Sequence, residues 1–267
     1  MDIVGVVLAG GEGRRFGGDK LIALVDGEPS VTRVAATLRV AGARLVYVIT
    51  RSVDRCKLYS ALAGIDGCLY DAPIGCRGPG AALAAISELG ARTVLVAPGD
   101  APWLSPSVYT GLMGFVDGCD AAAPLHGSGF VETLVMILRE RLVEEARSIA
   151  ERLCRARGDV RPSDYLRVAR CAVLVGSSLL GVLSPSSFAH INTRDAVRTR
   201  AARNPLGDKV VIELRGGALR ELLNGSRRSC ELLAREAESY KEAGIIHLAR
   251  HAVRDLEYFC GEERSQG

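Results

Sequence analysis

The chain has 267 residues, 48% of them hydrophobic and 24% charged, with a formal net charge of +3. This is ordinary globular composition, and the small, dispersed charge gives no reason to expect binding to nucleic acid or to an anionic membrane. No apolar run approaches the ~20 residues that span a bilayer. The first apolar run has no basic region before it, so we expect no signal peptide and a cytoplasmic location.

The first half of the chain alternates short apolar runs with amphipathic segments. We predict strands at 2–8, 44–50, 67–70, 93–97 and 119–124, and helices at 29–41, 53–63, 80–89 and 105–116. This alternation predicts a doubly wound, mostly parallel α/β sheet of Rossmann-like type, with helices on both faces. Ligands of such folds bind outside the carboxyl ends of the strands.

The second half of the chain changes character near residues 204–208. Before this boundary we predict strands at 131–138 and 171–176, and helices at 139–157, at 162–170 and after Asp195. The boundary separates residues 1–204 from a small helical C-terminal appendage, residues 205–267. The appendage is predicted to hold a brief strand at 209–214 and helices at 217–223, 226–242 and 244–260. The last two helices form an amphipathic hairpin, which we expect to pack on its own chain. A monomer and a homo-oligomer formed through this hairpin both stay open.

The eight cysteines are scattered, without a C-x-x-C pair, which excludes the usual spacing of metal ligands. We expect buried free thiols that act as small hydrophobic side chains. Internal disulfides are expected only in a hyperthermophile, where the rule of a reducing cytosol fails. His247 and His251 have the i, i+4 spacing of zinc ligands, but no third ligand is apparent, so a surface or packing role is favoured.

A glycine-rich loop follows the first predicted strand. The apolar run Ile3–Ala9 leads directly into Gly-Gly-Glu-Gly-Arg-Arg-Phe-Gly-Gly-Asp-Lys, residues 10–20. Glycines let backbone amides approach a ligand, and two arginines and a lysine add positive charge, so the loop predicts a polyphosphate site. It lacks the Gly-Lys-Ser/Thr of a Walker loop, and no acidic residue ends the second strand as in dinucleotide-binding folds.

The full string resembles the signature of the molybdenum cofactor guanylyltransferase-like family of NTP-transferases. The match runs from Leu8 to Lys20 in the pattern L-A-G-G-x-x-x-R-x-G-x-D-K and continues to Pro29. Three later segments are similar to family motifs in the expected order: 78–83, 97–102 and 190–195. The resemblance covers residues 2–195 and implies the nucleotide-diphospho-sugar transferase fold.

The resemblance implies transfer of an NMP from an NTP to a phosphate-bearing acceptor, with release of pyrophosphate. Because two polyanions must meet, catalysis consists mainly of charge neutralisation and in-line positioning. The catalytic candidates are Lys20, beside the α-phosphate, Arg15, and Asp100, which would hold Mg²⁺. The nucleotide-binding candidates are Leu8, Ala9, Gly10, Gly11, Gly13, Arg14, Asp71, Gly78, Pro79 and Asn192.

Several departures from the family pattern concern the base and the acceptor. Gly80 and Ala82 replace a leucine and a glycine of the second motif, and His190 and Arg194 stand where asparagine and proline are usual. The candidate acceptor loop, 127–130, lacks the expected polar residues. Transfer of GMP from GTP to molybdopterin is favoured. The alternatives are CTP-dependent molybdopterin cytidylyl transfer, guanylyl transfer to adenosylcobinamide phosphate, and a nucleotide-binding regulatory protein without catalysis.

Overall fold

The computed structural model describes residues 2–11, 15–71 and 73–261. The strands are β1 Ile3–Leu8, β2 Leu24–Val25, β3 Glu28–Pro29, β4 Leu45–Thr50, β5 Gly67–Tyr70, β6 Thr93–Pro98, β7 Ala121–Leu125, β8 Met136–Arg139, β9 Cys171–Gly176 and β10 Val211–Arg215. The α-helices are α1 Ser30–Val40, α2 Val53–Ser60, α3 Pro79–Ala82, α4 Pro106–Phe115, α5 Glu140–Arg157, α6 Pro162–Val168, α7 Ala196–Thr199, α8 Ala218–Leu223, α9 Ser229–Glu242 and α10 Ile246–Cys260. Short 3₁₀ helices occupy Leu83–Glu88, Ser177–Leu179 and Pro185–Phe188.

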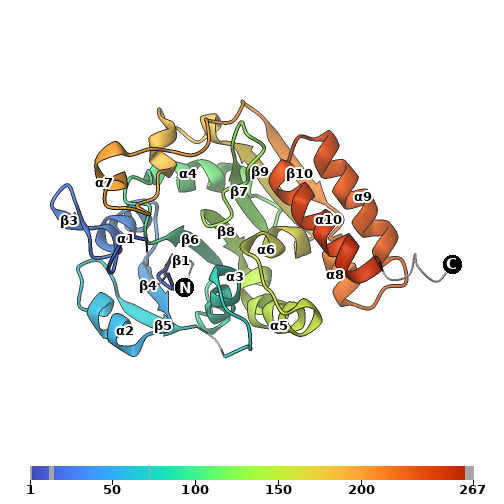
Figure 1. Cartoon of the computed structure of the whole chain (residues 1–267), viewed down its shortest axis with the longest axis horizontal. Helices are drawn as coiled ribbons and strands as arrows, with labels where there is room; N and C mark the ends of the chain where they lie inside the picture. The colour runs from blue at the N-terminus through green and yellow to red at the C-terminus, as the bar shows by residue number, and fades with distance from the viewer. Residues whose placement is uncertain (1, 12–14, 72, 262–267) are drawn as a thin grey trace.

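An eight-stranded sheet forms the centre of the molecule, in the order β10-β9-β7-β8-β6-β1-β4-β5 (Figure 1). Strand β8 runs antiparallel to β6 and β7, and β10 runs antiparallel to β9, whereas the other neighbours are parallel. The sheet is therefore mostly parallel, as predicted.

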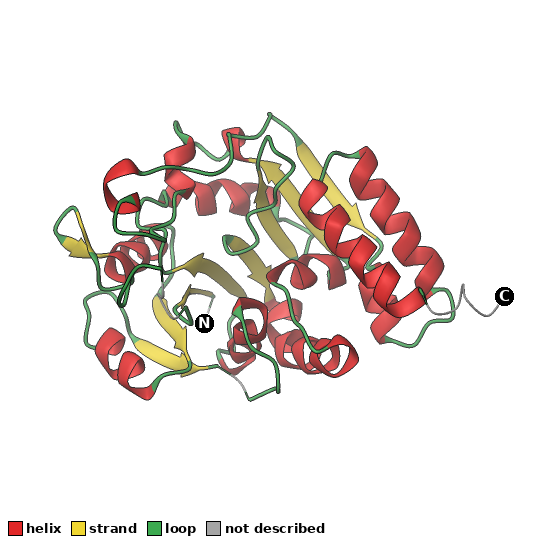
Figure 2. Ribbon diagram, viewed as in Figure 1, coloured by secondary structure: helices red, strands yellow, loops and turns green. Residues whose placement is uncertain are grey.

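Strand β1 explains how both faces of the sheet become covered. Successive side chains of a strand point to opposite faces. Val4 and Val6 accordingly pack with the core under α5 and α6, and Val7 packs with the core under α1 and α4 (Figure 2). A Cβ atom added to Gly5 would lie 3.0 Å from that of Leu38, so the glycine lets α1 approach the sheet closely. The doubly wound arrangement is confirmed.

Two predicted elements differ from the structure. The predicted strand 131–138 is shortened to β8, because residues 126–135 form a loop in which only Val131 bridges to Leu125. Gly129 has a φ of +73° in this loop, a value that suits glycine and turns the chain back. The predicted helix 80–89 divides into α3 and the 3₁₀ segment Leu83–Glu88.

The C-terminal segment packs against the rest of the chain, as predicted. Strand β10 extends the central sheet beyond β9. Helices α9 and α10 lie side by side at the end of the molecule beyond β10 (Figure 1), and Tyr240, Leu248 and Ala252 enter the larger core. Of the surface and packing roles expected for the two helical histidines, the structure shows packing: Nδ1 of His247 donates to the Val131 carbonyl at 2.9 Å, and Nδ1 of His251 lies 2.7 Å from Ser163 Oγ. None of the described helices is long and apolar enough to span a bilayer.

The expectation of free thiols is wrong. All eight cysteines form disulfides, with Cα–Cα separations of 4.7–5.9 Å: Cys56–Cys68, Cys76–Cys154, Cys119–Cys171 and Cys230–Cys260. The partners stand 12 to 78 residues apart in the sequence. Only the fold brings them within bonding distance, so spacing along the chain could not reveal the pairs.

Candidate active site

One cavity gathers most of the predicted site residues at the carboxyl ends of β1 and β6. It has a volume of about 570 Å³ and opens to solvent. The predicted residues in its wall are Leu8, Gly10, Gly11, Arg15, Lys20, Asp71, Gly78, Pro79, Asp100 and Asn192. The other lining residues, which were not among the candidate catalytic or binding residues, are Leu21, Arg51, Ala82, Pro98 and Leu134. The tertiary structure thus joins four sequence motifs around a single space.

Three predicted residues are not among those described in the cavity wall. Ala9 is buried behind the cavity, where its backbone amide donates to the Ile49 carbonyl at 2.9 Å. Gly13 and Arg14 lie outside the described residues. The candidate acceptor loop, 127–130, does not reach the cavity. A Cβ atom on Gly127 would lie 2.8 Å from the Leu206 carbonyl oxygen, and one on Gly129 would lie 2.2 Å from that of Gly244. The C-terminal segment therefore covers this loop.

Lys20, Asp100 and Asn192 meet in the cavity wall. The Lys20 ammonium forms an ion pair with Asp100 Oδ2 and donates a hydrogen bond to Asn192 Oδ1 at 3.0 Å. The side chains of Lys20 and Asp100 are 17% and 13% exposed, so the pair is shielded from bulk water but open to the cavity. A cation and two oxygen groups are thereby held where a polyphosphate could contact them.

His190 also contacts Asp100, an arrangement that the sequence did not predict. Its Nδ1 lies 2.9 Å from Asp100 Oδ1. Burial by itself would raise the pKa of Asp100, but the hydrogen bond and charge of His190, together with Lys20, outweigh it and lower that pKa to about 2. Burial would lower the pKa of His190, but Asp100 and then Glu132 outweigh it, and the pKa of His190 is raised. Asp100 is therefore ionised at neutral pH.

Asp19 secures the turn that presents Lys20. Its Oδ1 accepts the Leu21 amide at 3.0 Å, and its Oδ2 accepts the Tyr59 hydroxyl at 2.6 Å. Arg55 of α2 adds a contact at 3.6 Å to Asp19 and donates to the Gly11 carbonyl at 2.7 Å. The aspartate of the first motif thus has a structural role, while the adjacent lysine faces the cavity.

Asp71 lies across the cavity from this turn, at the end of β5. Its carboxylate is 3.5 Å from Arg51, and its side chain is only 6% exposed. Burial raises the pKa of Asp71, and the charge of Arg51 opposes the shift in part. Within the described part of the chain, Oδ1 of Asp71 accepts no hydrogen bond. The cavity therefore offers a buried acceptor to a ligand that carries N–H groups.

The oxygen groups of this wall fit a hard divalent cation. Mg²⁺ prefers one or two carboxylates together with amide, water and phosphate oxygens. Asp100 supplies an ionised carboxylate, and Asn192 supplies an amide oxygen near it through their shared contact with Lys20. Nothing in this set is a soft sulfur ligand, since all eight cysteines are bonded to one another.

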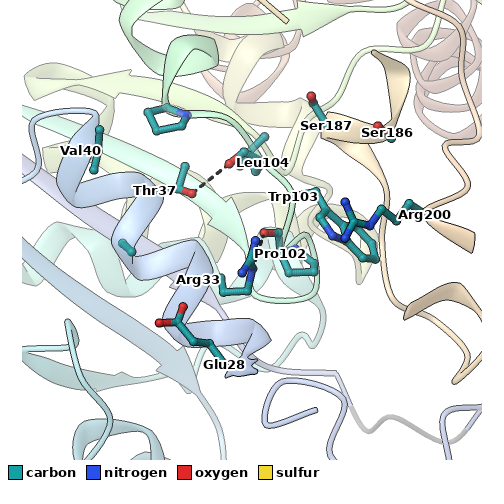
Figure 3. Close-up of a pocket in the computed structure, with 12 residues that line it drawn as sticks. Glu28, Arg33, Thr37, Val40, Pro102, Trp103, Leu104, Ser186, Ser187 and Arg200 are labelled. Atoms are coloured by element: carbon teal, nitrogen blue, oxygen red, sulfur yellow. Dashed lines mark hydrogen bonds between the residues drawn. The ribbon is translucent and has the colours of Figure 1, made fainter. Parts of the chain in front are cut away.

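A second pocket is lined by Pro102, Trp103 and Leu104, from the segment that follows β6 (Figure 3). Arg200 lies over the ring of Trp103 at 5.4 Å, and Thr37 Oγ1 donates to the Leu104 carbonyl at 2.9 Å. Arg200 is also paired with Asp26 at 3.0 Å. None of the predicted catalytic or nucleotide-binding residues lines this pocket, so it is separate from the candidate active site.

Comparison with known proteins identifies relatives of the same kind. The sequence profile of the MobA-like NTP transferase domain matches residues 5–167, more than half of the chain. A protein of Opitutus terrae named "probable molybdenum cofactor guanylyltransferase" is 32% identical over 128 residues, which are 48% of this chain and 62% of that protein. A protein of the same name from Haloferax mediterranei is 29% identical over 201 residues, 74% of this chain and 93% of the relative.

The fold also has solved counterparts. The crystal structure of molybdopterin-guanine dinucleotide biosynthesis protein A from Archaeoglobus fulgidus superposes with a TM-score of 0.56 at 24% identity, covering 75% of this chain and 96% of that one. A nucleotidyl transferase from Methanothermobacter gives a TM-score of 0.54 at 19% identity, covering 74% and 96%. The fold follows from these superpositions and the family from the matched profile: the chain belongs to the MobA-like NTP transferase family and is a nucleotidyltransferase.

Proposed function

We propose that this enzyme transfers GMP from GTP to the phosphate of molybdopterin and releases pyrophosphate, with Mg²⁺ as its metal. The observation that carries the proposal is the convergence of Lys20, Asp100 and Asn192 on a cavity bordered by the glycine loop. The names of the relatives from Opitutus and Haloferax support the choice of base and acceptor.

In the proposed reaction, an oxygen of the acceptor phosphate attacks the α-phosphorus of the donor. The bond from that phosphorus to the oxygen bridging to the β-phosphate breaks, and pyrophosphate leaves. The amides of Gly10 and Gly11, with Arg15, would hold the leaving phosphates. Lys20, on its flexible stem, would shift from Asp100 to the α-phosphate and neutralise the charge that grows there.

Asp100 would hold Mg²⁺ through the oxygen that faces Lys20, with Asn192 as a further oxygen donor. The bound cation would supply charge neutralisation on the phosphates. Asp100 is ready for this role at neutral pH, because His190 and Lys20 keep its pKa near 2 despite burial.

Asp71 supports guanine as the base. Guanine presents adjacent N–H donors at N1 and N2, and a carboxylate can accept both. Asp71 lines the cavity together with Gly78 and Pro79, and within the described residues its buried Oδ1 accepts no hydrogen bond. Cytosine has only its exocyclic amine to offer to the same carboxylate, so we expect the site to prefer GTP to CTP.

The proposed activity is tested by pyrophosphate release with GTP, CTP, ATP or UTP, Mg²⁺ and each candidate acceptor. GTP with molybdopterin should give the highest rate, and GTP should raise the melting temperature most in a parallel thermal-shift screen. A preference for CTP would favour the cytidylyl alternative, and turnover only with adenosylcobinamide phosphate would change the acceptor. Absence of release with every pair would leave a nucleotide-binding regulatory protein.

The role of Asp71 has its own test. Asp71→Asn converts one acceptor into a donor, so we expect kcat/KM for GTP to fall by ~100-fold. Glu28→Gln, in the wall of the second pocket, is the matched control and should leave the rate unchanged. Equal losses for GTP and CTP in the Asp71 variant would argue against a contact with the base.

The cytoplasmic location expected from the sequence stays a prediction. Four disulfides are rare in a reducing cytosol and are common in the cytosolic proteins of hyperthermophiles. The oligomeric state likewise stays open between a monomer and a homo-oligomer.

A further inference from the structure

His190 contacts the carboxylate that is proposed to hold the metal, on the side away from Lys20. Nδ1 of His190 lies 2.9 Å from Asp100 Oδ1, while Lys20 occupies Oδ2. An ionised carboxylate only accepts hydrogen bonds, so Nδ1 must carry the proton. The two oxygens of Asp100 are therefore held from opposite directions, by a rigid ring and by a flexible ammonium.

Glu132 stands behind the imidazole. Its Oε2 is 4.0 Å from Nε2 of His190 and 3.8 Å from Nε2 of His126. The Glu132 residue is 7% exposed, and backbone hydrogen bonds fix its loop, with its amide donating to the Pro124 carbonyl at 2.9 Å. The carboxylate thus faces two rings from a fixed position, and its charge favours the ring orientation that directs Nδ1 to Asp100.

The backbone reinforces this arrangement. The Ile191 amide donates to the Asp100 carbonyl at 2.9 Å, which joins the segment carrying His190 to the loop after β6. Phe188, two residues before His190, packs edge-on against His126 at 4.7 Å between ring centroids. These contacts fix the backbone on both sides of His190 and keep the residue beside Asp100, whereas Lys20 is held at the end of a flexible stem.

We propose that His190, supported by Glu132, is a positioning residue that holds the Asp100 carboxylate so that Oδ2 faces the metal and the phosphates. The inference rests on the proposed function, which requires Lys20 to leave Asp100 during the reaction. Once the ammonium has moved, the hydrogen bond from His190 is the side-chain contact that fixes the plane of the carboxylate. In the absence of His190, the carboxylate could rotate and the metal would bind less tightly.

The test compares three variants. His190→Ala removes the hydrogen bond to Asp100. His190→Asn introduces an Nδ2 donor that can replace Nδ1, so this variant should restore the hydrogen bond. Glu132→Gln keeps the size of the supporting group but removes its charge. Partners of metal-binding groups typically change metal affinity by 10- to 100-fold when removed. We expect a 10- to 100-fold loss for His190→Ala, less than 3-fold for His190→Asn, and an intermediate loss for Glu132→Gln.

The readout is binding of Mn²⁺, followed by electron paramagnetic resonance, in the presence of the α,β-methylene analogue of GTP, which cannot react. In activity assays, the Mg²⁺ concentration for half-maximal rate should rise more than kcat falls. Melting temperatures show whether His190→Ala folds. If it does not, the Mn²⁺ affinities of His190→Asn and Glu132→Gln test the positioning role.

Unchanged Mn²⁺ affinity in His190→Ala would overturn the inference, as would an equal loss in the alanine and asparagine variants. Failure of the proposed function is distinguishable from the wild-type protein alone, which would then release no pyrophosphate or would prefer another NTP or acceptor. An active wild-type enzyme with an unaffected His190→Ala variant would reject the positioning role alone.

Discussion

Two groups of charged residues in this molecule are built for opposite purposes. The group at the cavity combines Lys20, Asp100 and His190 around a space that a ligand can enter. The group between α5, α6 and the C-terminal hairpin surrounds Asp164 and Asp255, two carboxylates that are sealed from solvent. It consists of three arginines and three acids, with side chains 0–18% exposed: Arg157, Arg161, Arg167, Asp164, Glu236 and Asp255.

Asp255 illustrates the sealed group. It is fully buried and accepts from Arg157 at 2.9 Å, from Arg161 at 3.0 Å and also from Arg167. Each of these contacts joins Asp255 to another part of the protein. Loss of a partner would leave a buried charge without full compensation. Lys20 and Asp100, by contrast, keep most of their electrostatic stabilisation if a phosphate or a metal replaces one partner of the pair. Access to the cavity, and not the number of ion pairs, therefore distinguishes the candidate catalytic group from the structural group.

The largest expected effect tests the cavity group. Lys20→Ala and Asp100→Asn should each lower pyrophosphate release by ~1000-fold, because each removes charge stabilisation at the reacting phosphate. Stability should change by only about 1 kcal/mol, since the pair borders an open cavity. Arg200→Ala in the second pocket is the matched control and should keep full activity. Retained activity in purified Asp100→Asn would reject the metal assignment.

The sealed group should respond in the reverse way. Asp255→Asn leaves three arginines without their shared carboxylate, and we expect the free energy of unfolding to fall by ~3–5 kcal/mol in denaturant titrations. The folded fraction should keep its kcat. Glu231→Gln, which breaks solvent-exposed pairs with Arg228 and Arg235, should leave the denaturation midpoint almost unchanged. Similar losses in both variants would mean that burial does not separate these ion pairs.

One disulfide links the two regions. Cys76, two residues before the cavity residue Gly78, is bonded to Cys154 of α5 across 78 residues of sequence. Replacing both cysteines with serine should destabilise the protein by up to ~4 kcal/mol, because the unfolded chain gains the freedom of a long open loop. GTP affinity should weaken as well. Peptide mapping without reduction verifies the bond. The control is replacement of Cys230 and Cys260, 30 residues apart, which should lower stability but leave GTP affinity unchanged.

The last effect depends on pH and is small within any one pH unit. Burial, then the neighbouring His247 and the charges of Arg161 and Arg167, lower the pKa of His251 from 6.5 to about 3. Between pH 6.5 and 3, His251 is therefore protonated in the unfolded chain but neutral in the folded chain. The contribution of His251 to the free energy of unfolding is therefore fully present above pH 6.5. It is lost as the pH falls toward 3, at a rate of at most ~1.4 kcal/mol per pH unit.

His251→Gln should flatten the fall in stability between pH 6.5 and 4, as measured by denaturant titration at several pH values. Arg250→Gln, on the exposed side of α10, should keep the slope of the parent. An identical slope in His251→Gln and the parent would show that other groups carry the acid sensitivity.

Much of the fold could be predicted because its signals are local. The spacing of apolar residues located β5 and β9 to the residue, and Ser105 was correctly read as the start of α4, where its hydroxyl accepts the Ser107 amide. The sequence predicts a loop at 127–130 but places residues 131–135 in the following strand, because the buried Val131 and Val135 continue its apolar pattern. The division of the chain at 204/205 stays a prediction.

The sequence by itself determined the α/β class, the glycine loop and the order of the motifs that meet at the cavity, because these depend on periodicity and on residues close together in the chain. Only the tertiary structure decided which cysteines pair, that His190 reaches Asp100 from 90 residues away, and that Asp255 closes a buried ionic group. Those contacts join distant segments, and their partners are selected by how the sheet and its two layers of helices pack.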